Sequence, residues 1–312
     1  MVAALGIFDG VHRGHQKILV QAVARARRLR GRAVAITFDP HPLTVLHPKR
    51  APPRLMSLED RRAAFADCGI RASRVLSFTR SFSRWSPQRF VREILIRSLG
   101  VREVVVGHDF RFGADRIGTP ETLRELGKQY GFRVWVAAAV RIGGERVSSG
   151  RIREQIAAGD LRSAARFLGR PPSVTGRVVR GAGRGARLGF PTANLKVESG
   201  LLPPVGVYAV AASKRVPGLR PGTLSCSPLR AGMANLGRRP TFDRAGGRAP
   251  LLEVHLFGVR RRLYGRRLRV QFLQHLRAER RFASAEALSR QLDRDARRAK
   301  RVFALQARWR MV

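Results

Sequence analysis

The hydrophobic positions of residues 1–140 follow two alternating periods. Short, continuous apolar runs are typical of buried strands, and apolar residues that recur every three or four positions are typical of amphipathic helices. The runs predict strands at residues 2–8, 33–38, 75–78, 101–107 and 132–140, and the helical spacing predicts helices at 14–30, 58–68, 87–99 and 119–130. This alternation predicts a parallel sheet with helices on both faces.

The pattern changes near residues 169–172, where the sequence reads GRPP. Shorter β-type runs follow, separated by glycine and proline, at residues 174–179, 205–211, 231–236, 251–257 and 268–272. This spacing is typical of a small antiparallel barrel, and helical spacing returns at residues 285–304. We therefore expect an α/β domain at residues 1–170 and a β-barrel domain with a C-terminal helix at residues 171–312.

Length and composition agree with two globular domains, since 312 residues correspond to about two domains of roughly 150 residues each. The apolar opening at residues 2–8 is too short for a signal-peptide core, and no apolar run approaches the ~18 residues of a membrane span. Cys68 and Cys226 are too few for a disulfide framework or a four-cysteine zinc site. We expect a cytoplasmic protein without a membrane anchor.

The net charge is the unusual part of the composition. Lysine and arginine total 62 against 21 acidic residues, giving +41, and only six of the 62 are lysines. A field this positive attracts polyanions, so a basic nucleic-acid-binding protein stays open as an alternative function. The arginines are spread over the whole chain, and aromatic residues are only 7%, few for stacking on single-stranded bases. We therefore favour arginine enrichment of the surface, with non-specific but not specific nucleic-acid binding.

The string GIFDGVHRGH at residues 6–15 lies where the first predicted strand ends and the first helix begins. In an open α/β sheet, ligands bind at the carboxyl ends of strands, and a helix N-terminus offers N–H groups to phosphate. Gly10 and Gly14 allow a phosphate to approach the backbone, and His12 and His15 point the same way on an early helical turn. Paired imidazoles can donate hydrogen bonds to charge developing at phosphorus. The alternative is two exposed histidines at a helix start.

This string resembles the H-x-G-H signature of nucleotidyltransferases. FDGVHRGHQ resembles the amino-terminal module of the bacterial bifunctional riboflavin kinase/FAD synthetases, and three further strings are similar to that family: TFDPHP at 37–42, VGHDFRFG at 106–113 and VSSGRIR at 147–153. The resemblance implies a Rossmann-like nucleotidyltransferase domain, which moves AMP from ATP to FMN and releases pyrophosphate.

In-line attack by the FMN phosphate on the α-phosphorus requires mainly positioning and charge neutralisation. The resemblance places His12 and His15 at the ATP phosphates. Ser148, Ser149 and Arg151 open a later helix and would hold the departing pyrophosphate.

Asp39, Asp109 and Arg111 are expected to shape the nucleotide or flavin side of this site. For Asp109 and Arg111, an internal ion pair stays equally open. The family has threonine where Gly150 stands, so a hydroxyl that could contact phosphate is missing. A riboflavin kinase with a weakened or inactive adenylyltransferase domain therefore stays an alternative.

The second domain begins with the glycine-rich string GRVVRGAGRGARLGFPTANL at residues 176–195. Gly181, Gly183 and Gly185 would let this loop close over phosphates with its backbone N–H groups inward, although a flexible surface turn is the alternative. Thr192 and Asn194 face the same side of an extended chain. Both offer oxygen, which suits a Mg²⁺ that bridges nucleotide phosphates.

Glu253 is a carboxylate within an apolar strand, and an unpaired carboxylate there is costly to bury. We therefore expect it to face a cleft or a partner, with an arginine ion pair as the alternative. Four strings resemble riboflavin kinase signatures in the family's order: GFPTAN at 189–194, PVGVYA at 204–209, NLGRRPTF at 235–242 and LEVHLF at 252–257. The resemblance implies a riboflavin kinase-like barrel in which Glu253 takes the proton of the ribityl 5′-hydroxyl.

The resemblance covers about residues 2–304, and one departure lies in the barrel, where arginines at 260–262 replace acidic residues of relatives. It implies a bifunctional enzyme that phosphorylates riboflavin to FMN and adenylylates FMN to FAD. The implied co-substrate is ATP, the implied metal is Mg²⁺, and no tightly bound prosthetic group is expected.

Overall fold

A computed structural model describes residues 1–181, 189–216, 225–226, 229–238, 250–259 and 263–309 of the protein. The chain forms two compact units: the first contains Met1–Arg54 and Leu58–Ser149, and the second contains Gly150–Leu219 and Leu224–Val312. The units therefore divide the chain at residue 149, whereas the hydrophobic pattern changes near residue 170. The domain boundary at residue 170 stays a prediction.

The first unit is built on a five-stranded parallel sheet with the order β3-β2-β1-β4-β5. Its strands are β1 (Val2–Leu5), β2 (Ala33–Asp39), β3 (Ala72–Ser77), β4 (Glu103–Gly107) and β5 (Arg133–Ala137). A small hairpin of β6 (Arg141–Ile142) and β7 (Glu145–Arg146) follows. The parallel α/β class predicted from the alternating pattern is confirmed.

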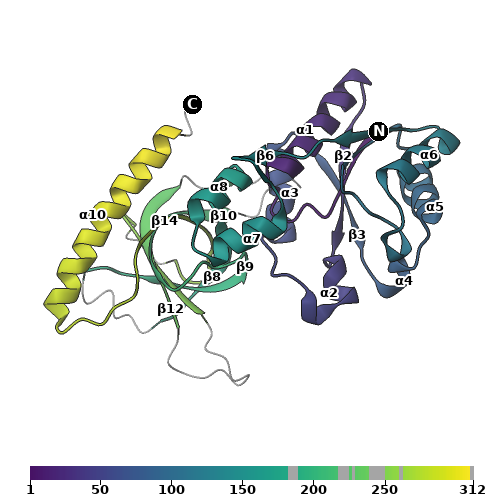
Figure 1. Ribbon diagram of the computed structural model, residues 1–312. Coiled ribbons are helices and arrows are strands. Elements are labelled where there is room, and N and C mark those ends of the chain that lie inside the picture. Colours follow the sequence, from purple (N-terminus) through teal and green to yellow (C-terminus); the bar gives the residue numbers. More distant parts are fainter. Residues whose placement is uncertain (182–188, 217–224, 227–228, 239–249, 260–262, 310–312) are drawn as a thin grey trace. The chain divides into compact units, whose positions relative to one another are not determined.

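Helices cover both faces of this sheet (Figure 1). Helix α1 (Arg13–Arg28) presents Ile18, Leu19 and Ala22 to one face. The other face carries a core formed with α5 (Pro87–Phe90), the π-helix η2 (Val91–Ser98) and α6 (Pro120–Tyr130). The remaining helical segments are α2 (Pro42–Leu46), η1 (Pro48–Arg50), α3 (Leu58–Asp67), α4 (Arg80–Ser83) and η3 (Ala114–Arg116).

Several elements of the first unit differ from their predicted bounds or form. Strand β3 begins at Ala72 rather than at residue 75, and β5 ends at Ala137 rather than at residue 140. The first strand ends at Leu5 rather than at residue 8, because residues 6–12 leave the sheet as a loop. The predicted helix at 87–99 is present but changes from α to π geometry at Val91. Hydrophobic periodicity does not distinguish these two helix types over so short a segment.

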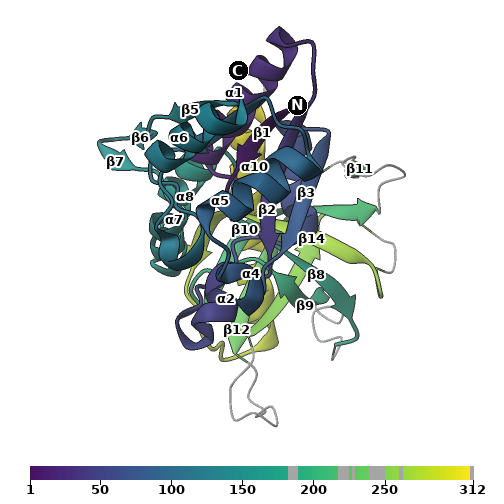
Figure 2. The same cartoon turned by 90° about the vertical axis from the view of Figure 1, so that its right-hand side faces the viewer.

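The second unit contains a closed antiparallel barrel. Six strands close in the order β10-β12-β13-β9-β8-β14, with β14 pairing back to β10. The short β11 pairs antiparallel with the end of β10. Figure 2 shows β8 between β9 and β14. The strands are β8 (Ser173–Val179), β9 (Ala193–Ser199), β10 (Gly206–Val216), β11 (Ser225–Cys226), β12 (Arg230–Arg238), β13 (Pro250–Leu256) and β14 (Arg267–Arg277). The predicted barrel is confirmed, and β9 and β11 were not anticipated.

The barrel has a packed interior and a separate apolar contact on its outer surface. Alternate residues of the strands, such as Tyr208, Leu252 and Phe272, fill the interior. Helix α10 (Ala285–Trp309) packs outside, where Ala296 and Ala299 lie in a second apolar cluster with β10, β12 and β14. Helices α7 (Ser149–Ala157) and α8 (Leu161–Leu168) precede the barrel. No described helix is both long and apolar enough to span a membrane.

Candidate active sites

The topology of the parallel sheet selects one place for a ligand. Strand β1 lies between β2 and β4, and the chain passes from β1 to β2 and later returns to β4 on the other side of β1. Loops that follow two such strands diverge, and ligands of open α/β sheets bind in the space between them. The loop at residues 6–12 follows β1, and residues 108–112 follow β4. The histidine motif therefore lies at the switch point of the sheet.

His12 and His15 are stacked at the start of α1. Their ring centroids are 3.6 Å apart with 16° between the planes, and the His12 Nδ1 accepts a hydrogen bond from the His15 backbone N–H at 3.2 Å. His12 is only 6% exposed, and the Phe8 ring meets the His15 ring edge-on. Since Nδ1 of His12 is an acceptor, a neutral His12 carries its proton on Nε2. That nitrogen is then a donor.

The loop before the histidines is conformationally strained. Phe8 and Val11 have positive φ values of 54° and 38°, and Gly10 has a φ of 84°. A positive φ is costly for a β-branched residue such as valine, and such strain persists only when the surrounding structure enforces it. Phe8 and Val11 are completely buried, so packing holds the loop in this form.

Residues 147–149 lie against this loop. The Ser149 hydroxyl donates a hydrogen bond to the Asp9 carbonyl oxygen at 2.8 Å, although the two residues are 140 positions apart. A Cβ on Gly14 would lie 3.9 Å from the Val147 carbonyl oxygen. Ser148 is half-buried beside Ser149. The histidine string at residues 6–15 and the serines of the string that begins at residue 147 are therefore neighbours in this unit.

Arg151 lies in the first turn of α7, two residues after Ser149. Its guanidinium is half-exposed and pairs with Glu154 at 3.1 Å, three residues further along the same helix. An exposed pair of this kind contributes little to stability.

A buried arginine that the sequence analysis did not anticipate lies beneath the loop. Arg61 on α3 is 1% exposed and donates to the Thr37 hydroxyl at 3.0 Å and to the Phe38 carbonyl at 3.1 Å. Thr37 in turn donates to the Ile7 carbonyl at 2.8 Å, so the ends of β1 and β2 are joined. Burial lowers the pKa of Arg61, and the carboxylates of Asp9 and Asp39 oppose that shift. Among so many arginines, no sequence signal marked this one.

The three residues expected on the nucleotide or flavin side lie in different surroundings. Asp39 ends β2 and pairs with Arg54 at 3.0 Å. Asp109 is 65% exposed in its side chain and lies 3.7 Å from Arg146, and Arg111 donates to the Phe110 carbonyl. Asp109 and Arg111 are thus surface groups after β4 and do not form the internal ion pair that was the alternative.

In the barrel, three polar residues form a row across neighbouring strands. Glu253 on β13 lies opposite Asn194 on β9 and opposite Asn235 on β12. Residues directly opposite in an antiparallel pair share one face of the sheet. Leu252 and Val254 point into the barrel interior, so the row lies on the outer face. Glu253 is half-buried there.

The glycine-rich string meets this row at Asn194. Asn194 is buried, and a Cβ on Gly181 would collide with its side-chain amide, so only glycine allows the backbone this close. Thr192 is half-buried two residues before Asn194. Gly183 and Gly185 lie outside the described residues.

Oxygen donors around this row fit a magnesium ion. The Thr192 hydroxyl and the Asn194 amide oxygen are of the hard type that Mg²⁺ prefers, and few protein ligands suffice because the ion keeps several waters. Within the described part of the chain, no cluster of three or more His, Cys, Asp or Glu side chains is placed to hold a metal.

His255 fixes the segment that carries Thr192. It shares the outer face of β13 with Glu253, two residues away, and its Nδ1 lies 2.8 Å from the Pro191 carbonyl oxygen. Its ring also meets the rings of Phe190 and Phe257 edge-on. His255 therefore holds residues 190–191 against β13, a role that the sequence did not reveal.

An α/β unit with paired histidines at its switch point, followed by a barrel with a carboxylate between two asparagines, is typical of a two-part transferase that acts on nucleotide phosphates. Comparison with known families agrees, because the FAD synthetase model matches residues 1–151 and the riboflavin kinase model matches residues 168–303. The chain belongs to the bifunctional riboflavin kinase/FMN adenylyltransferase family.

Relatives match the chain over nearly its full length. The bifunctional riboflavin kinase/FMN adenylyltransferase of Escherichia coli (strain K12) is 37% identical over 304 residues, covering 97% of this chain and 93% of the relative. That of Pseudomonas fluorescens is 40% identical over 303 residues, with the same coverage. A crystal structure described as a macrolide-efflux protein from Streptococcus pneumoniae has a TM-score of 0.82 at 30% identity, covering 96% of this chain and 93% of that one.

Proposed function

We propose that this protein makes both flavin cofactors from riboflavin. In the first reaction, riboflavin and ATP give FMN and ADP; in the second, FMN and another ATP give FAD and pyrophosphate. The supporting observation is that the chain forms two compact units and matches two family models, one for FAD synthetase and one for riboflavin kinase. FMN passes from one site to the other through solution.

For adenylyl transfer, an FMN phosphate oxygen forms a bond to the α-phosphorus of ATP, and the bond to pyrophosphate breaks. The Nε2–H of His12 and the ring of His15 lie at the N-terminus of α1, where the helix dipole also stabilises negative charge. The stacking and the Nδ1 hydrogen bond fix the rings before substrate arrives, which is the requirement for electrostatic catalysis.

Pyrophosphate leaves on the side of residues 148–151. Ser148, Ser149 and Arg151 supply hydroxyl and guanidinium donors, and the Ser149 contact with Asp9 supports this placement for the serines. Asp39, Asp109 and Arg111 orient the nucleotide or the flavin. Gly10 and Gly14 leave the backbone open to phosphate.

For riboflavin phosphorylation, the ribityl 5′-hydroxyl forms a bond to the γ-phosphorus, its proton passes to Glu253, and ADP leaves. Thr192 and Asn194 hold Mg²⁺, which neutralises charge on the ATP phosphates when bound. Gly181, with Gly183 and Gly185, lets the loop approach those phosphates. The register of Glu253 with Asn194 supports placing the base beside the metal ligands.

Product chromatography of two variants tests these assignments. Glu253→Gln should stop FMN formation and leave FAD formation from supplied FMN intact, and His12→Ala should do the reverse. Exposed counterparts serve as controls: Glu198→Gln on β9 and His47→Ala after α2 should change neither product. Kinase activity of Glu253→Gln within a few-fold of the parent enzyme would refute the base assignment, and loss of both activities in His12→Ala would indicate misfolding.

A cytoplasmic location and the lack of specific nucleic-acid binding stay predictions.

A further inference from the structure

The carboxylate of Glu279 has a prepared place on the outer face of the barrel. The Asn235 side-chain N–H donates to the Glu279 Oε1 at 2.9 Å, across 44 residues of sequence. Gly237 lies two residues after Asn235 on the same face of β12, and a Cβ there would lie 2.5 Å from the same Oε1. Glycine at 237 therefore leaves the space that the carboxylate occupies.

This contact determines the orientation of a neighbour of Glu253. Asn235 lies directly opposite Glu253 in the β12–β13 register, at a separation of about 5 Å between Cβ atoms for such pairs. An amide has a donor end and an acceptor end, and Glu279 accepts only from the donor end. The Asn235 amide cannot turn over without directing its oxygen at the Glu279 carboxylate. Glu279 therefore fixes which group Asn235 presents beside Glu253.

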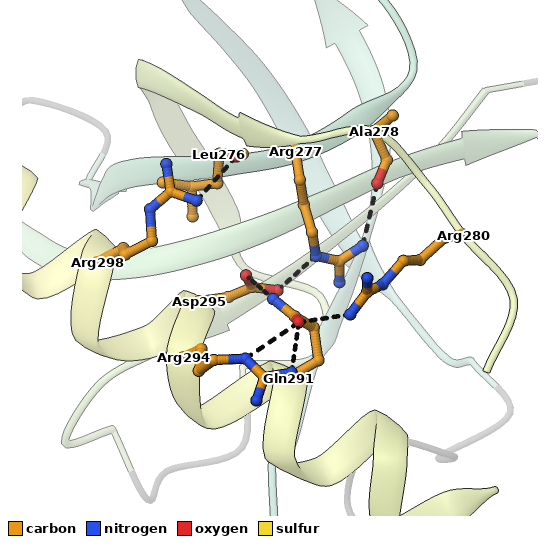
Figure 3. A network of polar contacts seen from close by, with 8 residues as sticks. All are labelled: Leu276, Arg277, Ala278, Arg280, Gln291, Arg294, Asp295 and Arg298. Atoms are coloured by element: carbon orange, nitrogen blue, oxygen red, sulfur yellow. Dashed lines mark hydrogen bonds and ion pairs between the residues drawn. The ribbon is translucent and has the colours of Figure 1, made fainter. Parts of the chain in front are cut away.

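Arg277 and Arg280, which lie on either side of Glu279 in the sequence, contact helix α10 through their side chains (Figure 3). Arg277 pairs with Asp295 at 2.8 Å, and Asp295 is completely buried. Gln291 donates to Asp295 at 2.8 Å and accepts from Arg280 at 2.5 Å. The residues on both sides of Glu279 are thus tied to one helix. The Glu279 side chain, although it lies at the barrel surface, therefore extends from a segment that is anchored on both sides.

We propose that Glu279 is a positioning residue for riboflavin phosphorylation, acting on Glu253 through Asn235. The inference rests on the proposed role of Glu253 as the base. Glu279 does not touch the reacting atoms. Its loss leaves ATP and riboflavin binding unchanged and lowers the turnover number, because the base and the attacking hydroxyl are then misaligned more often.

Steady-state kinetics of riboflavin phosphorylation, with the ATP and riboflavin concentrations varied in turn, separates an effect on substrate binding from an effect on turnover. Glu279→Ala should lower kcat by ~10-fold, since misplacement by a fraction of an ångström to an ångström costs rates of this order, and should leave both KM values within two-fold. Glu279→Gln keeps an accepting oxygen and should recover most of kcat. Gly237→Ala keeps the carboxylate but displaces it, and should resemble Glu279→Ala.

A double-mutant cycle shows whether the effect passes through Asn235. Asn235→Ala should lower kcat to a similar degree, and adding Glu279→Ala should lower it no further. Glu198→Gln removes a barrel carboxylate that pairs with Arg267 away from this contact, and it should have no effect. FAD formation from supplied FMN should be unchanged in every variant.

Three results would overturn the proposal. Glu279→Ala could keep kcat within two-fold of the parent, or it could raise KM without lowering kcat. In the double variant of Asn235→Ala and Glu279→Ala, the two losses of kcat could multiply as independent effects do. If Glu253→Gln stays active, the base assignment fails. If Glu253→Gln is inactive and Glu279→Ala is fully active, only the positioning role fails.

Discussion

Substitution of Gly14 by alanine should separate adenylyl transfer from stability. A Cβ at this position would lie 3.1 Å from Cε1 and 3.2 Å from Nδ1 of His12, so the ring must shift by a few tenths of an ångström. The ring has little freedom to do so, because it is buried and stacked on His15 at 3.6 Å. The shift therefore also weakens the Nδ1 hydrogen bond that caps α1.

The two effects on stability oppose each other. Replacing glycine by alanine in a helix contributes up to ~1 kcal/mol, and losing a side-chain cap costs about 1 kcal/mol. The free energy of unfolding should therefore stay within about 1 kcal/mol of the parent value. Transfer to FMN should fall by roughly 10-fold, because the histidine donors no longer meet the phosphate in their optimal geometry.

The assay measures FAD made from supplied FMN and ATP, with FMN made from riboflavin as an internal reference, and urea unfolding reports stability. Gly31→Ala is the matched control after the other end of α1, where a Cβ meets only ordinary contacts at 3.8 Å or more. Full FAD formation by Gly14→Ala would refute the claim that the His12 ring position limits the reaction. Equal loss of both products would show a folding defect instead.

Three further predictions concern the first unit and the start of the second. Arg61→Met should lower the free energy of unfolding by about 3 kcal/mol, since it leaves the buried Asp9 carboxylate and the Phe38 carbonyl without the Arg61 cation. Urea unfolding followed by Trp85 and Trp135 fluorescence measures this loss, and an unchanged midpoint would contradict it. Gly150→Thr should raise the FAD formation rate, whereas Gly150→Ala should not, and equal rates would show that the missing hydroxyl is unimportant. The Asp160 carboxylate caps α8 by accepting a hydrogen bond from the Ser163 N–H, and this hydrogen bond lowers the pKa of Asp160. The cap therefore stabilises the fold fully above the ordinary pKa of aspartate, and this stabilisation is lost as the pH falls through the lowered pKa. Asp160→Ala should therefore cost about 1 kcal/mol at neutral pH and progressively less below about pH 4, and a pH-independent cost would contradict the charge assignment.

Fold class was predictable because hydrophobic periodicity reports which face of each element is buried. The strand at 33–38 and the helix at 119–130 differ from β2 and α6 by one residue at one end. Strand β9 was not predicted because Ala193–Ser199 includes lysine, glutamate and serine, which interrupt any apolar run. Helix α8 was missed although Asp160 caps its start and Gly169 adopts a left-handed conformation at its end.

The candidate sites were predictable only as far as local strings carry information. His12 and His15 lie three residues apart, and His12 caps the helix that carries His15, so local structure brings the two rings together. The Ser149–Asp9 contact and the placement of Glu279 on Asn235 join residues that are 140 and 44 positions apart. Such contacts depend on strand order and register, which hydrophobic patterns do not specify.

Mixing two inactive variants tests the central claim most directly, which is that one chain has two independent phosphate-transfer sites linked by free FMN. Supplied with riboflavin, ATP and Mg²⁺, Glu253→Gln alone should leave riboflavin unchanged, and His12→Ala alone should accumulate FMN. The mixture should form FAD, because FMN from one variant reaches the intact adenylyl site of the other. FAD formed by either variant alone, or none formed by the mixture, would contradict the account.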